Sequence, residues 1–145
     1  LKTATAKNEI DAKGKAIAPG FINMLSWANE SLIEDGNSQS DIRQGVTLEV
    51  MGEGSSMGPL NANMKAEMQN GQSDIKYNVA WNTLGEYLTF LEKKGVSCNV
   101  ASFIGAGTIR EYVVGKDTRV ATAAELDSMR VLVKQAMEEG ASGIG

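Results

Sequence analysis

The sequence predicts an α/β protein built on a mainly parallel sheet. Short, almost continuously apolar segments alternate along the chain with longer segments whose apolar residues recur every three or four positions. The first pattern is typical of buried parallel strands and the second of amphipathic helices. Glycines fall mainly at the ends of the apolar runs, where they mark the ends of elements. Strands and helices in this order are joined by right-handed crossovers, with the helices covering the sheet.

The first elements predicted are two short strands in a β-hairpin. Residues 8–18 mix apolar and polar side chains around the turn candidate Lys13-Gly14, and Pro19-Gly20 closes the segment. The later elements follow from the two patterns above. In chain order they are a strand at 21–25, a short helix at 38–44, a strand at 46–51, a short helix at 61–71, a helix at 83–95, a strand at 96–104, a short helix at 108–114, a helix at 122–140 and the start of a strand at 141–145.

Three of the predicted helices carry a capping box at their start. In this motif a threonine hydroxyl accepts a hydrogen bond from the third amide of the helix while a glutamate there bonds back to the cap. The pairs are Thr83 with Glu86, Thr108 with Glu111, and Thr122 with Glu125. The helix from Thr83 is the clearest, because its leucines and tyrosine lie on one face and Lys93-Lys94-Gly95 ends it.

Composition excludes several classes of partner. A net charge of -4 and a pI near 4.9 provide no basic surface, so we expect no binding to nucleic acid. No run approaches the roughly 18–20 apolar residues that a membrane span needs, and residues 1–10 lack the apolar centre of a secretory signal, so we expect a soluble protein. The single Cys98 cannot form an internal disulfide. The absence of histidine removes the commonest metal ligand from this chain.

The alternation alone fits two architectures, a doubly wound sheet and a (β/α)₈ barrel. The predicted strands make only about half of a barrel, which usually has ~250 residues. Gly52-Glu53-Gly54 and Gly105-Ala106-Gly107 each give two glycines of a dinucleotide fingerprint, but the third position falls at Met57 or Arg110. A nucleotide-binding doubly wound domain therefore stays open as an alternative.

Three stretches carry a resemblance to a known family. Residues 10–22, IDAKGKAIAPGFI, resemble the segment that leads from a small β domain into the barrel of amidohydrolases. Residues 40–47, SDIRQGVT, with Gly52 and Pro59-Leu60, resemble the second-strand region of D-aminoacylases and N-acyl-D-amino-acid deacylases. Residues 139–145, EGASGIG, resemble the start of their fourth strand. The resemblance implies a partial (β/α)₈ TIM barrel, about its first half, at residues 20–145, with residues 1–19 ending the N-terminal β subdomain.

The chain departs from this family at the metal ligands. The family's first strand ends in Asp-x-His-x-His, whose imidazoles bind a divalent metal, whereas Asn23, Leu25 and Trp27 stand at the aligned positions. The branch also has a metal-binding cysteine in a Gly-Asn-Cys-Gly setting, where this chain has Gly52-Glu53-Gly54-Ser55. The family's ligands therefore cannot be carried over onto these residues.

Glu53 is the candidate metal ligand, because it follows a strand on the side where barrels place their chemistry and a carboxylate can bind zinc. The alternative is a solvated acid in a glycine and serine loop.

Asn23, Ser26 and Trp27 are candidate substrate-binding residues at the end of the first strand; alternatively, Leu25 and Trp27 simply fill the barrel mouth. Glu49 is a weaker candidate ligand, because it lies in mid-strand. Cys98 is expected to be a small buried residue rather than a nucleophile.

The resemblance implies a metal-dependent hydrolase of carbon–nitrogen bonds that acts on a small N-acyl amino acid with a divalent metal, most simply zinc. Its catalytic residues are expected beyond Gly145. We therefore expect the chain alone to be inactive and, with an open sheet edge, to self-associate. A second hypothesis is a non-catalytic ligand-binding barrel that has lost its metal site.

Overall fold

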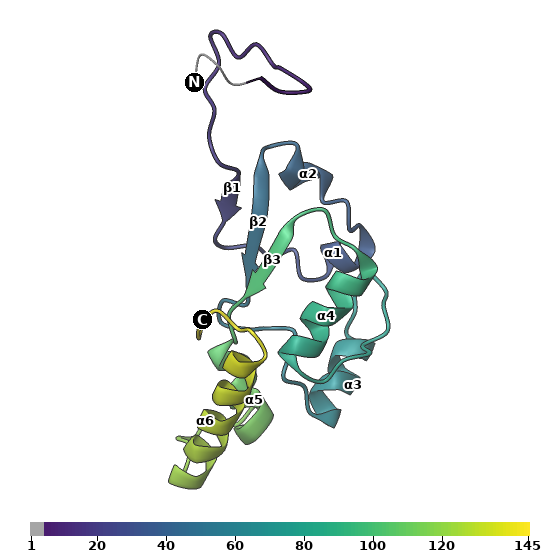
Figure 1. Cartoon of the computed structure of the whole chain (residues 1–145). Helices are drawn as coiled ribbons and strands as arrows, with labels where there is room; N and C mark the ends of the chain where they lie inside the picture. Colours follow the sequence, from purple (N-terminus) through teal and green to yellow (C-terminus); the bar gives the residue numbers. More distant parts are fainter. Residues whose placement is uncertain (1–4) are drawn as a thin grey trace.

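The computed structural model describes residues 5–145 and contains a parallel sheet with helices packed beside it (Figure 1). Its strands are β1 (Phe21–Asn23), β2 (Val46–Met51) and β3 (Asn99–Ser102), in the spatial order β1-β2-β3. Both neighbouring pairs are parallel. The predicted α/β class is confirmed.

Six helices complete the described part of the chain: α1 (Ser31–Glu34), α2 (Gln39–Ile42), α3 (Ala62–Asn70), α4 (Leu84–Lys94), α5 (Ala106–Val114) and α6 (Ala123–Glu138). In Figure 1, α1, α3 and α4 lie to one side of the sheet, whereas α5 and α6 run alongside each other beyond the ends of the strands. No helix within residues 5–145 combines the length and the apolar character needed to cross a membrane.

The order of the strands bears on the doubly wound alternative that the sequence left open. A parallel bridge joins Ile104 to Ile144, so the segment after α6 lies beside β3. The four segments therefore follow one another in chain order across the sheet. In doubly wound sheets the chain instead returns to the side of the first strand. The observed order disfavours the doubly wound alternative.

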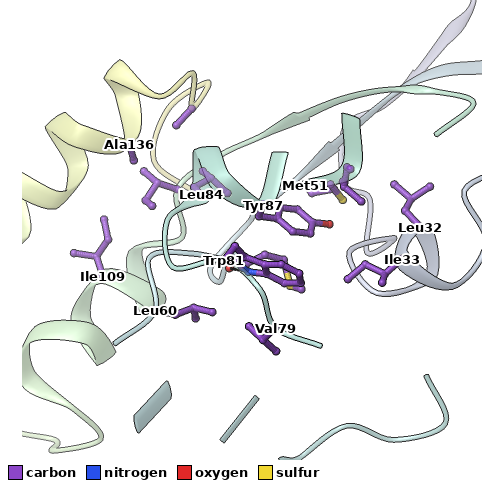
Figure 2. Close-up of a cluster of buried hydrophobic side chains, with 14 of the residues drawn as sticks. Leu32, Ile33, Met51, Leu60, Val79, Trp81, Leu84, Tyr87, Ile109 and Ala136 are labelled. Atoms are coloured by element: carbon purple, nitrogen blue, oxygen red, sulfur yellow. Dashed lines mark hydrogen bonds between the residues drawn. The ribbon is translucent and has the colours of Figure 1, made fainter. Parts of the chain in front are cut away.

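The core lies between the sheet and the helices and is centred on Trp81 (Figure 2). Trp81 is 1% exposed, and its ring centroid lies 5.2 Å from that of Tyr87 and 5.1 Å from that of Phe90. Tyr77 stacks on it at 5.9 Å. The indole Nε1 donates a 2.6 Å hydrogen bond to the carbonyl oxygen of Met57, which satisfies its polar atom. Trp81 thus joins α4, the segment before it and the loop after β2.

The predicted N-terminal hairpin is wrong in its strands and right in its turn. The amide of Lys15 donates to the carbonyl of Ala12, and Gly14 takes a φ of 73° at the turn. Residues 5–20 form no strand, and nearly all of them are exposed. A two-stranded hairpin is marginal in water unless it packs on something, and nothing in residues 21–145 covers this one. Residues 1–4 of the expected β subdomain lie outside the described residues.

Two of the three predicted capping boxes are confirmed, at Thr83 of α4 and at Thr122 of α6. The third is wrong, because α5 begins earlier, with Gly105 as its N-terminal cap. Thr108 lies inside α5, is buried, and accepts a 2.8 Å hydrogen bond from the amide of Ser56 instead. The Thr108 hydroxyl, which would accept a hydrogen bond from its own helix in a capping box, is used instead in a tertiary contact. The last predicted strand, 141–145, is reduced to the bridge at Ile144.

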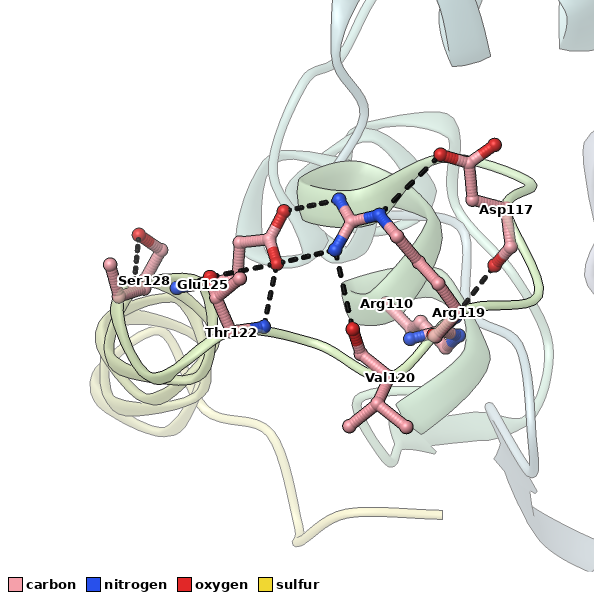
Figure 3. A network of polar contacts seen from close by, with 8 residues as sticks. Arg110, Asp117, Arg119, Val120, Thr122, Glu125 and Ser128 are labelled. Carbon is pink, nitrogen blue, oxygen red and sulfur yellow. Dashed lines mark hydrogen bonds and ion pairs between the residues drawn. The ribbon is translucent and has the colours of Figure 1, made fainter.

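Arg119 connects the α5–α6 loop to the start of α6 (Figure 3). Its guanidinium forms two hydrogen bonds with the carboxylate of Glu125 and an ion pair with Asp117. Glu125 also accepts hydrogen bonds from the amide and the hydroxyl of Thr122. Arg119 and then Thr122 hold the pKa of Glu125 well below its usual range.

The start of α6 is therefore expected to lose stability in acid. A carboxylate with a lowered pKa in the folded state stabilises that state above its unfolded pKa of about 4.3, and this contribution is lost as the pH falls toward the folded pKa. Glu125→Gln keeps a side chain that can complete the capping box but removes the charge. Urea unfolding should show the wild type more stable than the variant at pH 7, with the difference shrinking toward pH 3. A difference that stays constant over this range would contradict the assignment.

Candidate functional site at the carboxyl ends of the strands

The loops that follow β2 and β3 meet the last residues of the chain at one edge of the sheet. The amide of Gly107 donates to the carbonyl of Gly54 at 2.8 Å, and the amide of Ala106 donates to the carbonyl of Gly145 at 2.8 Å. Gly145 donates back to the carbonyl of Ile104 at 3.0 Å. This edge is where parallel α/β folds place their chemistry.

Glycine is required here because the backbones approach closely. A Cβ at Gly105 would lie 2.5 Å from the Cα of Ser55, and a Cβ at Gly52 would lie 2.2 Å from the carbonyl oxygen of Phe103. Gly52 also has a φ of 90°. The amide of Gly105 donates to the hydroxyl of Ser56, so like Gly107 it has a protein partner. These glycines let the loops pack closely together. The amides of Gly105 and Gly107 are already hydrogen-bonded within the protein and are not free to hold a phosphate, which further disfavours the nucleotide-binding alternative.

Glu53, the predicted metal ligand, lies exposed in the loop after β2. A Cβ at Gly145 would be 3.0 Å from the Cα of Glu53, so the backbone at residue 145 passes directly beside it. Within residues 5–145, however, no three His, Cys, Asp or Glu side chains gather closely enough to hold a metal ion. Catalytic zinc sites usually take three protein ligands. The described residues therefore do not form a metal site by themselves.

The predicted site residues at the end of β1 and after it differ in their exposure to solvent and in their hydrogen bonds. Trp27 is 68% exposed and Leu25 is 52% exposed, and neither side chain can coordinate a metal. Asn23 is half-buried, and its side-chain oxygen accepts a 3.3 Å hydrogen bond from the amide of Leu25. Ser26 is buried and bonded to Glu49. Trp27 is thus open to a ligand, whereas the hydroxyl of Ser26 is engaged within the protein; their roles in substrate binding stay a prediction.

Glu49 of β2 is fully buried and accepts three hydrogen bonds from neutral donors. They come from the hydroxyl of Ser26 at 2.6 Å, the hydroxyl of Ser38 at 2.8 Å and the thiol of Cys98 at 3.1 Å. No lysine or arginine in the part of the chain that the structure describes forms an ion pair with it. Glu49 is therefore not open to a metal. A glutamate inside an apolar strand is the one sequence signal for this cluster.

Cys98 serves as a donor in this cluster. Its side chain is buried, as predicted. Burial first, and then the hydrogen bond to Glu49, raise the pKa of the thiol to about 11. The thiol consequently stays protonated at neutral pH and can donate to the carboxylate. Burial and the raised pKa disfavour a thiolate nucleophile at this position.

The chain has extensive similarity to deacylases of one bacterium, although no protein-family model matches it. It is 33% identical over 146 residues to the D-aminoacylase of Alcaligenes xylosoxydans xylosoxydans, which covers 99% of this chain and 30% of the relative. It is 30% identical over 138 residues to the N-acyl-D-aspartate deacylase of the same organism, covering 93% of this chain and 27% of that protein.

Solved structures agree with these relatives. The crystal structure of a D-aminoacylase that defines a novel subset of amidohydrolases matches with a TM-score of 0.69 and 28% identity, over 87% of this chain and 27% of that one. The N-acyl-D-glutamate deacylase of Bordetella bronchiseptica, complexed with zinc and a phosphonate inhibitor, matches with a TM-score of 0.70 and 28% identity, over 92% of this chain and 28% of its own.

The similarity is therefore spread over nearly the whole of this chain but over less than a third of each relative. It holds in sequence and in three dimensions alike. The chain is homologous to the D-aminoacylases and N-acyl-D-amino-acid deacylases of the amidohydrolases, and it corresponds to a segment of between 27% and 30% of the length of these relatives.

Proposed function

We propose that this chain forms the opening part of a (β/α)₈ barrel in an enzyme that hydrolyses the carbon–nitrogen bond of N-acyl-D-amino acids. The observation that carries the proposal is the agreement of fold and sequence with D-aminoacylase along nearly the whole chain. Strands that follow one another in chain order, each parallel to the last, are what a barrel requires. In this proposal residues 20–145 open the barrel and residues 1–19 end a preceding β subdomain.

The edge that carries Trp27 and Glu53 would then belong to the barrel mouth. Trp27 would provide an apolar wall for the substrate, with Asn23 and Ser26 as neighbouring polar groups. Glu53 could contribute one carboxylate to a zinc site whose other ligands come from outside this chain, as zinc is present in the related glutamate deacylase. No catalytic step is assigned to residues 5–145, because they do not complete a metal site.

The second candidate is a barrel that binds a related small amide without hydrolysing it. It is favoured by the two non-coordinating side chains, Leu25 and Trp27, exposed after β1. It is also favoured by the complete lack of histidine in the 145 residues. Both candidates predict an apolar binding surface at Trp27 and differ in whether a metal-activated water is present.

Purified alone, the 145-residue chain should release no D-amino acid from N-acetyl-D-amino acids, with or without added zinc. The substrate panel should include aliphatic and acidic side chains, with the L-enantiomers as controls. The protein as its gene encodes it should hydrolyse the D-enantiomers if the enzyme proposal holds. Binding of the same compounds without turnover would favour the second candidate. Turnover by the chain alone would overturn the proposal that its catalytic groups lie elsewhere.

Self-association of the chain is a further part of this proposal. Phe21 and Ile22 of β1 are 62% and 53% exposed, and Met24 after them is 59% exposed. β1 also has no neighbour on its outer side among residues 5–145. Exposed apolar side chains on an unpaired edge strand favour association between copies. In the whole protein we propose that further strands cover this surface.

A further inference from the structure

Trp27 combines a well-anchored backbone with an exposed side chain. The residue before it, Ser26, donates its amide to the carbonyl of Val50 at 2.9 Å. The residue after it, Ala28, donates its amide to the hydroxyl of Ser26 at 3.2 Å. The indole between them is nevertheless 68% exposed. A mobile loop would expose an indole in many orientations, whereas this backbone is fixed on both sides.

Glu49 secures this anchor from inside the sheet. The Ser26 hydroxyl uses its single hydrogen to donate to Glu49 Oε2 at 2.6 Å, which leaves its lone pairs to accept from Ala28. The other carboxylate oxygen, Oε1, accepts from Ser38 and Cys98 and so cannot swing away without losing both. The carboxylate therefore fixes the direction of the Ser26 hydroxyl.

We infer that Glu49 and Ser26 are positioning residues that hold Trp27 as a fixed aromatic surface at the carboxyl edge of the sheet. In this inference Ser26 acts through the backbone on either side of Trp27. The use of that surface for the apolar part of an N-acyl-D-amino acid rests on the proposed function. The positioning itself is a property of the chain and is measurable without any ligand.

The experiment labels the two tryptophans of the full 145-residue chain with 5-fluorotryptophan and records their fluorine NMR signals. Trp27→Phe assigns the two resonances, and the signal of buried Trp81 reports whether each variant is folded. Ser26→Ala should shift and sharpen the Trp27 signal while leaving that of Trp81 in place, because the indole gains mobility. Glu49→Gln should move the Trp27 signal in the same direction by a smaller amount.

Ser38→Ala is the matched control, because it removes a hydroxyl donor to the other oxygen of the same carboxylate, Oε1, and Ser38 is not adjacent to Trp27 in the chain. It should lower the denaturation midpoint as Ser26→Ala does, without altering the Trp27 signal. If Ser26→Ala fails to fold, Ser26→Cys and Ser38→Cys give the same comparison with weaker donors. An unchanged Trp27 signal in the Ser26 variant, or an equal change in the Ser38 variant, would overturn the inference. Neither result depends on turnover or on ligand binding, so the proposed function is tested separately.

Discussion

Trp81→Ala should lower the free energy of unfolding by about 3–5 kcal/mol, the cost typical of removing a large aromatic side chain from a core. Trp81 is almost fully buried, and its ring contacts those of Tyr77, Tyr87 and Phe90. The variant also leaves the carbonyl of Met57 without its indole donor. Domains of this kind have total stabilities of about 5–15 kcal/mol, so a large share of the variant should be unfolded under mild conditions. Urea unfolding followed by circular dichroism measures the loss.

Trp27→Ala is the control for this measurement. It deletes the same side chain from a position that is 68% exposed, so the free energy of unfolding should change by no more than about 0.5 kcal/mol. The contrast separates the structural tryptophan from the one that we place at the barrel mouth. Equal losses for the two variants would mean that Trp27 is part of the core in solution, which would contradict its exposure and its proposed role.

Local patterns were sufficient for the elements that carry their own start and stop signals. Residues 46–51 form β2 over their whole length, because the run is mostly apolar and Gly52 ends it with a positive φ. The helix that begins after Thr83 ends at Lys94 before Gly95, as its capping box and glycine predict. For α4 the decisive interactions join residues only a few positions apart, which a sequence pattern records directly. For β2 the apolar composition identifies the strand, although its pairing partners β1 and β3 are distant in sequence.

The core around Trp81 was not identified from the sequence, because the residues before α4 follow neither the helical nor the strand period. Trp81 lies in an irregular segment, and its burial depends on packing against α4 and on the loop at Met57, which is 24 positions away. Thr108 failed as a predicted cap for a similar reason. Its hydroxyl accepts a hydrogen bond from the amide of Ser56, which is 52 positions away. Long-range contacts override local preference at such places.

The cluster at Glu49 shows the same limit for a candidate site. Its donors Ser26, Ser38 and Cys98 lie 23, 11 and 49 positions away, so only the folded chain brings them together. The sequence interpretation placed Ser26 at the substrate because it stands at the end of the first strand. The neighbouring residue does point to solvent, but Ser26 itself is turned inward to Glu49. Position after a strand does not distinguish the side chain that points to solvent from the one that points into the protein.

Glu49→Ala should cost the chain about 3 kcal/mol of folding stability. The substitution leaves two hydroxyls and a thiol without their acceptor in a buried position, and each unsatisfied polar group costs about 1–3 kcal/mol. The loss is partly offset, because a fully buried carboxyl group with no cationic partner among residues 5–145 carries a desolvation penalty that the variant avoids. Glu49→Gln keeps one acceptor oxygen and the shape of the side chain, so a smaller loss of about 1–2 kcal/mol is expected.

The matched control is Glu53→Ala, which removes a carboxylate four residues further along the same segment. Glu53 is exposed, so its removal should change the free energy of unfolding by no more than about 0.5 kcal/mol. The wild type and the three variants are compared by urea unfolding at pH 7. The loss of stability should be largest for Glu49→Ala, smaller for Glu49→Gln and smallest for Glu53→Ala. If Glu49→Ala left the free energy of unfolding unchanged, the three donors would have to find other partners when the carboxylate is gone. The Trp27 anchor would then have to be maintained by backbone bonds alone, such as that from the Ser26 amide to Val50.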